Sequence, residues 1–541
     1  MRTRFLTLLI PTAVLLGVTG IVVWAARPHL PDENAPPLPA HFSDLQTVVS
    51  NVDLLFESGW KKAGVTPVAT ADELQVLRRL SLALCGTVPS LEEIRQFETD
   101  TAPDRIARWT TRLLEDNRYA DYFAARLSRS FVGADQGQFI VFRRGQFNDW
   151  LSQQLRENAP YDEIVRTMIS ETGLWTGTPA TNFVTAAVSD GELDENKLAG
   201  RSVRAFLGQR IDCAQCHDHP FDHWKQHEFE GLASWFGQTK VSLVGVEDKR
   251  DQIYEVEDRK TLEMRPIAPT VPFHPEWLPA EGTRREQLAA WVTHPENRRF
   301  ERATANRIWG LLFGKPYVEP VDAVPDPGEN SPADLLDLLG ADFRTHHYDL
   351  RRLILAIATS RPFRLESSHP SDLEGELAEK QASEWGSFPL TRLRPEQIIG
   401  SMLQASSIKT IDQNSHLVKR AVRFFRERDF VNEYGDLGDS ELEDHPGTIP
   451  QALLRMNGDF TSDSVESGFL GSSGRIARFA GSNTQLLETC YLVCLARRPT
   501  EQERAYFIPQ LEEASKGEER ERTVEDIYWA LFNSPEFSWN H

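Results

Sequence analysis

The sequence predicts a mainly α protein, in which a single N-terminal membrane anchor is followed by two helical domains joined by a small β or irregular connecting segment. Three observations predict this fold class. An uncharged apolar run occupies residues 5–26, apolar residues recur at a spacing of three and four along most of the chain, and a Pro-rich stretch interrupts that pattern within residues 241–285. At 541 residues, the chain is also too long for a single core.

The apolar run near the N-terminus has the composition of a membrane-spanning helix. At about 1.5 Å per residue it can cross a hydrocarbon core of roughly 30 Å, and it is longer than the ~7–15 apolar residues of a signal peptide. Arg2 and Arg4 precede it, which favours a cytoplasmic N-terminus. We therefore expect residues 1–26 to be a single-pass inner-membrane anchor, with a cleaved signal peptide as the alternative. In either case the body of the protein lies in the periplasm or outside the cell.

The first exported part of the chain is predicted to be a stalk and a helical domain. Residues 27–45 are Pro-rich and predict a semi-rigid stalk. In the domain that follows, residues 46–240, capping boxes at Thr70–Glu73 and Ser90–Glu93 each open a helix. Further amphipathic helices are predicted at residues 103–116, 119–132, 148–158, 161–172 and 197–211.

The connecting segment, residues 241–285, has a different pattern. Residues 240–246 and 252–258 alternate like short strands, and residues 265–279 are too rich in Pro for regular structure. Helical patterns return in the second domain, residues 286–541, where Thr500–Glu503 is a third capping box. Its predicted helices include residues 285–297, 298–314, 332–343 and 349–360, and two near the C-terminus.

The composition excludes some classes of function. The net charge of −21 argues against nucleic-acid binding, because neutralising phosphates needs clustered Lys and Arg. Five cysteines are too few for a disulfide framework in an exported chain of this length. Cys490 and Cys494 lie in an apolar helical stretch and are predicted to be buried small hydrophobes. The sequence contains no nucleophile elbow, phosphate loop, dinucleotide fingerprint or HExxH motif, so nothing in it identifies a hydrolase.

The stretch "DCAQCHDHPFDHWKQHEFE", residues 212–230, holds the residues best suited to chemistry. Cys213 and Cys216 have the spacing that reaches the two vinyl groups of one porphyrin, and His217 follows as an axial ligand. Haem is attached to such motifs outside the cytoplasmic membrane, which agrees with the predicted export. The sequence therefore predicts haem c on Cys213 and Cys216, with His217 bound to the iron. It selects no sixth ligand.

A metal site without porphyrin is the alternative interpretation. A helix beginning at Pro220 would place His219, His223 and His227 along one face. Thiolates and imidazoles together suit tetrahedral Zn²⁺, although the second ligand pair of a zinc motif is missing. The alternative zinc set consists of Cys213, Cys216, His217, His219 and His223.

Two interpretations involve no metal. The two thiols could act in thiol–disulfide exchange, or form a fixed structural disulfide. His223 and His227 could also lie on the polar side of a helix whose apolar side packs into the core. The apolar side of that helix would comprise Phe221, Trp224, Phe229, Leu232, Trp235 and Phe236.

Several stretches of the chain resemble a known pair of domains. Residues 76–100 and 206–224 resemble the planctomycete cytochrome-c-like domain of the second type. Residues 305–324, 331–343 and 349–364, together with the C-terminal stretch, resemble the planctomycete-specific domain that usually follows it. The resemblance extends over nearly the whole chain from about Val49. The family residues that it carries over are Cys213, Cys216, His217, Asp218, His219, Pro220 and Phe221.

The resemblance implies an exported protein of unknown specific role. Both domains are of unknown function, and relatives are often encoded beside a sulfatase-like protein, which implies a periplasmic redox or sulfatase-like partner. The leading expectation is a membrane-anchored c-type-cytochrome-like protein that takes part in redox or electron transfer. The competing expectation is a non-haem structural or interaction protein in which the Cys/His stretch binds zinc or forms a disulfide. A third class, an enzyme that uses the haem or metal, leaves enzymatic activity undecided.

Overall fold

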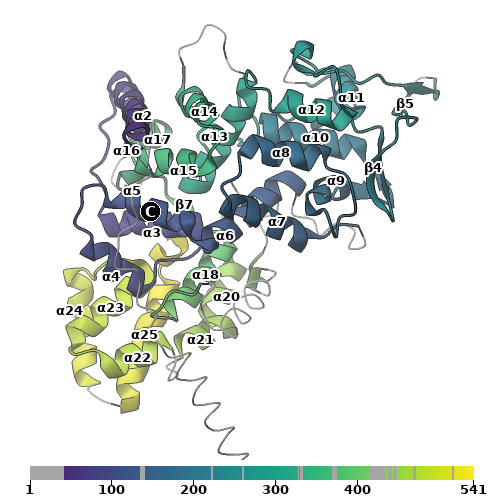
Figure 1. Ribbon diagram of the computed structural model, residues 1–541. Helices are drawn as coiled ribbons and strands as arrows, with labels where there is room; N and C mark the ends of the chain where they lie inside the picture. Colours follow the sequence, from purple (N-terminus) through teal and green to yellow (C-terminus); the bar gives the residue numbers. More distant parts are fainter. Residues whose placement is uncertain are drawn as a thin grey trace, which may run out of the picture.

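The computed structural model consists mostly of helices, with a few short two-stranded ribbons (Figure 1). The mainly α class predicted from the sequence is therefore confirmed. The structure describes residues 42–133, 141–220, 223–258, 261–326, 328, 333–367, 375–412, 430–431, 433–435, 442, 447–466, 471–514 and 517–541.

The first half of the chain forms the helices that the apolar spacing predicts. Their ends differ from the predicted ends by only a few residues, as is usual for frayed helix termini. The elements are α2 (Phe42–Ala63), α3 (Glu73–Cys85), α4 (Leu91–Thr99), α5 (Arg105–Glu115), α6 (Asn117–Val132), α7 (Arg144–Arg156), α8 (Tyr161–Ser170), η1 (Pro179–Thr181), α9 (Asn182–Thr185), β1 (Val188–Ser189), β2 (Glu192–Leu193), α10 (Glu195–Leu207), η2 (Asp212–Gln215) and α11 (Gln226–Ala233).

The predicted short strands are present in the connecting segment. β3 (Thr239–Ser242) pairs antiparallel with β4 (Gly245–Asp248), and β5 (Glu255–Glu257) pairs antiparallel with β6 (Met264–Pro266). The Pro-rich stretch after β6 contains only the short η3 (Pro275–Trp277). These elements lie together with α11 at one end of the molecule (Figure 1).

The second half is again helical. Its two short strands join distant parts of the chain, because β7 (Thr391–Arg392) pairs with β8 (Trp539–Asn540) near the C-terminus. The remaining elements are α12 (Arg284–Val292), α13 (Arg298–Phe313), α14 (Leu335–Thr345), α15 (Leu350–Thr359), α16 (Arg361–Arg364), α17 (Glu376–Ser383), α18 (Pro395–Ala405), α20 (Ile449–Asn457), α21 (Asp459–Val465), α22 (Ser472–Phe479), α23 (Asn483–Leu495), α24 (Glu501–Glu513), α25 (Gly517–Asn533) and η6 (Glu536–Ser538).

Two of the three predicted capping boxes are present, at Ser90 and Thr500. The third prediction was wrong. α3 begins at Glu73, and its N-cap is Asp72, whose carboxylate accepts the N–H of Leu74 at 2.8 Å. Thr70 instead forms an isolated antiparallel bridge with Leu365, a residue almost 300 positions later in the sequence. A pairing with so distant a residue cannot be predicted from the sequence around Thr70.

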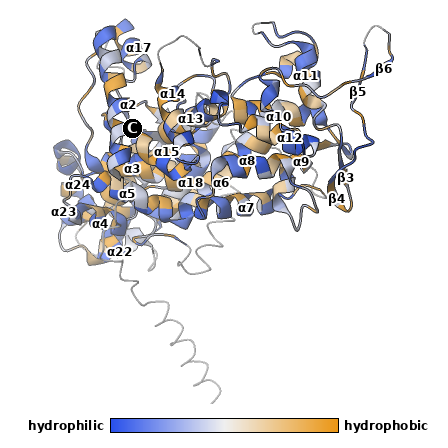
Figure 2. Cartoon of the chain, turned by 45° about the horizontal axis from the view of Figure 1, so that its top comes forward, coloured by the Kyte–Doolittle hydropathy of each residue, from blue (hydrophilic) through white to orange (hydrophobic). Residues whose placement is uncertain are grey.

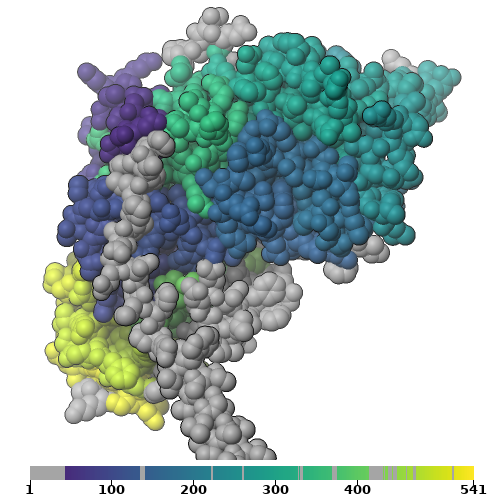
Figure 3. Space-filling model, in the orientation of Figure 1, coloured from purple at the N-terminus to yellow at the C-terminus, as the bar shows by residue number. Residues whose placement is uncertain are grey.

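The core is continuous between the two halves of the chain. α13 is almost wholly buried and packs against α14 and α15 of its own half and against α3 and α10 of the first half. α2 packs on α14 and α15, and the ring of Phe56 stacks on Trp309 of α13 at 5.9 Å. The space-filling view shows the first-half residues, purple and blue, in direct contact with the green and teal second half (Figure 3). In a cartoon coloured by hydropathy, both halves show the mixture of apolar and polar positions expected of amphipathic helices (Figure 2).

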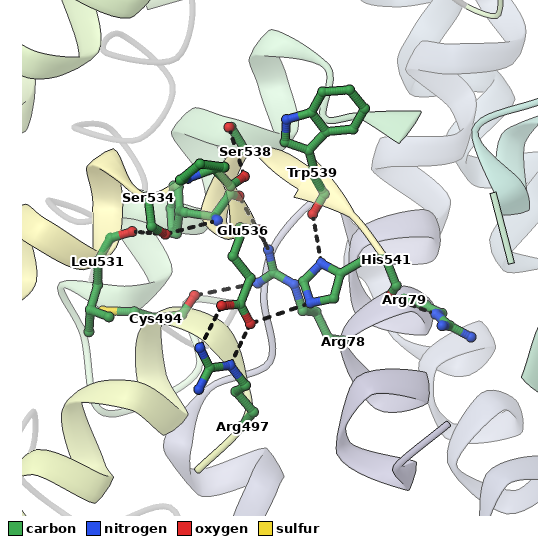
Figure 4. A network of polar contacts seen from close by, with 12 residues as sticks. Arg78, Arg79, Cys494, Arg497, Leu531, Ser534, Glu536, Ser538, Trp539 and His541 are labelled. Atoms are coloured by element: carbon green, nitrogen blue, oxygen red, sulfur yellow. Dashed lines mark hydrogen bonds and ion pairs between the residues drawn. The ribbon is translucent and has the colours of Figure 1, made fainter. Parts of the chain in front are cut away.

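The C-terminus is bound to α3 by two buried arginines (Figure 4). Arg78 donates to the carbonyl oxygens of Cys494, Glu536 and Phe537, and Arg79 donates to those of Phe363, Leu365 and His541. Burial lowers the pKa of Arg78 to about 10, which leaves it charged at neutral pH. α3 and the last residues of the chain therefore form one packed unit.

No helix within the described residues is long and apolar enough to span a bilayer. The predicted anchor, residues 1–26, and most of the predicted stalk, residues 27–45, lie outside the described residues.

Candidate functional site

The Cys-x-x-Cys-His stretch lies on the surface, in the connection between α10 and α11. α10 ends at Leu207, its C-cap Gly208 has a left-handed backbone with a φ of 64°, and the short η2 then carries Cys213. Cys213, Cys216 and His217 are exposed, whereas Ala214 between the two cysteines is buried and holds the turn against the core. Both cysteines are free thiols.

Polar contacts, most of them with the second half of the chain, fix the residues before Cys213. The carboxylate of Asp212 pairs with Arg204 at 2.6 Å, and the buried Asp322 accepts from Nε of Arg210 at 2.5 Å. The side chain of Gln209 donates to the carbonyl of Val324, and the amide of Val324 donates to the carbonyl of Gly208 at 2.9 Å. The start of the motif is therefore attached to the loop that follows α13, a contact that the sequence pattern did not predict.

A second set of contacts fixes the residues after Cys216. Nδ1 of His217 lies 2.7 Å from the carbonyl oxygen of Asp218. The carboxylate of Asp218 accepts the amide of Gln226 at 3.1 Å and Nζ of Lys225 at 3.2 Å, and these hydrogen bonds lower its pKa. The amide of His219 donates to the carbonyl of Trp224 at 2.8 Å. These bonds connect Asp218 and His219 to Trp224, Lys225 and Gln226.

The predicted helix beginning at Pro220 is wrong. α11 begins only at Gln226, after Lys225 as N-cap, so His219 and His223 precede the helix and His227 alone lies within it. The bond from the amide of His219 to the carbonyl of Trp224 runs opposite to the direction of helical hydrogen bonds. Trp224, which precedes the helix, is 1% exposed. The three histidines therefore do not share a helix face.

The apolar side predicted for this stretch is confirmed where it is described. Its buried members are Trp224, Phe229, Leu232, Trp235 and Phe236, and Phe221 lies outside the described residues. His223 and His227 are exposed beside it, which agrees with the interpretation of a polar helix flank for His227.

The alternative zinc set is not assembled as a ligand cluster in the part of the chain that the structure describes. No group of three or more His, Cys, Asp or Glu side chains there is arranged to hold a metal ion. Cys213, Cys216, His217, His219 and His223 all belong to the described residues. Zinc binding by this set remains a prediction that needs a rearrangement of the turn.

The other cysteines are separate from this site. Cys85, Cys490 and Cys494 are buried and form no disulfide, and burial is as predicted for the last two. Burial raises the pKa of the Cys490 and Cys494 thiols, so they are poor nucleophiles and poor ligands.

Other features that could take part in ligand binding lie away from the Cys-x-x-Cys-His stretch. Met168 and Met402 are fully buried in the core and so cannot approach a group bound at the surface. A cavity of about 20 Å³ is lined by side chains that do not belong to the motif. The lining comprises Arg126, Arg129, Ser130, Arg307, Leu311, Val321 and Leu442.

Two family models match the chain. The first, PSCyt2, described as a protein of unknown function (DUF1549), matches residues 51–241, which include the whole Cys-x-x-Cys-His turn. The second, PSD1, described as a protein of unknown function (DUF1553), matches residues 284–510. The chain belongs to the planctomycete family that joins these two domains. No curated protein and no solved structure gives a significant match.

The family assignment shows which parts of the chain build the site. Cys213, Cys216 and His217 belong to the PSCyt2 domain, whereas Asp322 and Val324 belong to the PSD1 domain. Because Arg210 and Gln209 bond to these two PSD1 residues, the PSD1 domain helps to hold the PSCyt2 motif in place.

Proposed function

We propose that this protein is a membrane-anchored, exported c-type-cytochrome-like protein that binds one haem covalently and takes part in redox or electron transfer. The observation that carries the proposal is the arrangement of three exposed side chains. Cys213 and Cys216 are free thiols, and the Nδ1 contact of His217 leaves Nε2 as the ring's acceptor atom. Metal-ligating histidines in proteins usually donate their other ring N–H in this way.

The chain's own residues would supply attachment and ligation. Cys213 and Cys216 would hold the porphyrin through thioether bonds, since each S–H would add across one vinyl C=C with its hydrogen going to the other vinyl carbon and no atom being lost. His217 would hold the iron through Nε2. The bound haem would supply reversible one-electron transfer. The exposure of all three side chains supports this assignment, because a buried His217 would leave no room for a porphyrin.

The location and partner belong to the same proposal. The apolar run at residues 5–26, with Arg2 and Arg4 before it, supports an inner-membrane anchor and a body in the periplasm. A periplasmic redox or sulfatase-like partner is proposed from the resemblance alone.

The intact mass of the denatured protein tests haem attachment. The full chain is expressed with cytochrome c maturation machinery beside the Cys213→Ala, Cys216→Ala double variant, and the Cys85→Ala variant serves as a matched control. We expect one haem's mass on the wild type and on Cys85→Ala, and none on the double variant. An unmodified wild type, obtained while a known c-type cytochrome in the same cells is modified, would reject the proposal.

The same purified protein also tests the competing class, a non-haem protein in which the Cys/His stretch binds zinc or forms a disulfide. A colourless protein that contains Zn²⁺ removable by a chelator would favour the metal site, and a mass two hydrogens lighter than the free-thiol chain would favour a disulfide.

A further inference from the structure

The peptide group between Asp218 and His219 is held at both ends. Its N–H donates to the carbonyl of Trp224 at 2.8 Å, and its C=O lies 2.7 Å from Nδ1 of His217. The N–H and C=O of a trans peptide point in opposite directions. The bond to the buried Trp224 therefore aims the Asp218 carbonyl at the His217 ring.

This carbonyl determines which nitrogen of His217 carries the proton. A carbonyl oxygen only accepts hydrogen bonds, so Nδ1 must be the protonated nitrogen of the neutral ring. Nε2 then carries the lone pair on an exposed side chain. This tautomer is the one that can bind a metal through Nε2.

The side chain of Asp218 also restrains this peptide group, through hydrogen bonds to its carboxylate. Its two carboxylate oxygens accept from the amide of Gln226 and from Nζ of Lys225. Gln226 is the first residue of α11, and its N–H is one of the donors that a helix start leaves without an intrahelical partner. Asp218 thus connects the ring of His217 to the start of a helix that packs on α10.

We propose that Asp218 is the positioning residue of this site: its carboxylate holds the turn on α11 so that its carbonyl fixes His217 as the Nδ1–H tautomer, with Nε2 presented for ligation. The role in ligation rests on the proposed function, whereas the tautomer is a property of the haem-free chain. The sequence motif contains Asp218 but gives no indication of this role, because the contacts with Trp224 and Gln226 depend on the turn.

The haem-free full chain tests the tautomer directly. Protein from cells without maturation machinery is labelled with ¹³C at histidine Cδ2, whose chemical shift separates the two neutral tautomers, and a spectrum is recorded at pH 8. The His217→Gln variant assigns the signal. We expect the Nδ1–H shift in the wild type and in Asp218→Asn, which keeps an acceptor for Gln226. We expect a move toward the Nε2–H shift in Asp218→Ala.

An exposed carboxylate elsewhere provides the control. Asp251→Ala, in the turn after β4, should leave the His217 signal unchanged. Circular dichroism of each variant checks that the fold persists. A wild-type signal at the Nε2–H position, or an Asp218→Ala signal identical to the wild type, overturns the proposal.

The haem-loaded protein gives a second readout. A hydrogen-bonded Nδ1–H makes the imidazole a stronger electron donor to iron. Asp218→Ala should therefore raise the reduction potential while the haem mass remains, and an unchanged potential contradicts the positioning role. If no haem attaches but the tautomer responds to Asp218→Ala, the positioning role stands and the proposed function fails.

Discussion

At the residue scale, buried charged side chains join α13 to α14. Arg302, whose side chain is 4% exposed, bonds to Asp334 and Asp337, and Arg344 pairs with Glu301 at 3.1 Å. Burial outweighs the nearby arginines at Glu301 and raises the pKa of its carboxyl to about 7. Glu301 therefore changes its charge within the physiological pH range.

Glu301 should make the stability of the protein depend on pH. The folded protein holds the Glu301 proton up to about pH 7, whereas the unfolded chain releases it near 4.5. Between these values the unfolded state binds fewer protons, so the free energy of unfolding falls as the pH rises. At about 1.4 kcal/mol per pKa unit, we expect a loss on the order of 3 kcal/mol that Glu301→Gln does not show.

Urea unfolding of the wild type and Glu301→Gln at pH 4.5, 6 and 7.5 measures this difference. Glu518→Gln is the matched control, because its side chain is 90% exposed. Equal pH dependence in the wild type and Glu301→Gln would show that Glu301 does not titrate in this range.

At the element scale, glycines allow two helices to approach closely. A Cβ built on Gly400 of α18 would lie 2.5 Å from the carbonyl oxygen of Gly86, the C-cap of α3. Backbone at a helix end cannot move aside cheaply. By contrast, a Cβ on Gly59 of α2 meets nothing within 4 Å.

The same substitution should therefore have opposite effects at these two positions. Gly400→Ala should lower the free energy of unfolding by ~1–3 kcal/mol, because it separates α18 from α3. Gly59→Ala should raise it by about 0.5–1 kcal/mol, because Ala loses less conformational entropy within a helix. Urea unfolding measures both variants, and a neutral Gly400→Ala would contradict the close crossing.

Sequence patterns predicted the elements that are determined locally. The capping boxes at Ser90 and Thr500 depend on residues three apart, and the structure confirms both. The predictions at Thr70 and Pro220 were wrong because other contacts form there: Thr70 pairs with Leu365, and the amide of His219 donates to the carbonyl of Trp224. The candidate site likewise contains residues that local patterns predict and residues that they do not. Its thiols and His217 were named from their spacing, but Asp322 and Val324, which hold the motif from more than 100 residues away, carry no local signal.

At the scale of the whole molecule, the PSCyt2 and PSD1 domains share one core. α3 of the PSCyt2 domain packs on α13 of the PSD1 domain, and Arg78 bonds to carbonyls at the end of α23 and in η6. Arg497 pairs with Glu503 and Glu536 beside them. Burial opposes ionisation of Glu536, but hydrogen bonds from Arg497 and His541 outweigh it and lower its pKa to about 2. Unfolding either domain would expose the other's packed face.

The two domains should therefore unfold in one transition. Cys85 reports on α3, and Cys490 and Cys494 report on α23, because all three thiols are buried and none is in a disulfide. Pulsed thiol labelling across a urea series, read by peptide mass, should give the same midpoint for both helices. Arg78→Met leaves three carbonyls without a donor, so both midpoints should fall together, by about 3 kcal/mol in the free energy of unfolding. Arg95→Met, on the exposed face of α4, should change neither. Labelling of Cys494 at a urea concentration that still protects Cys85 would show that the PSD1 domain unfolds independently.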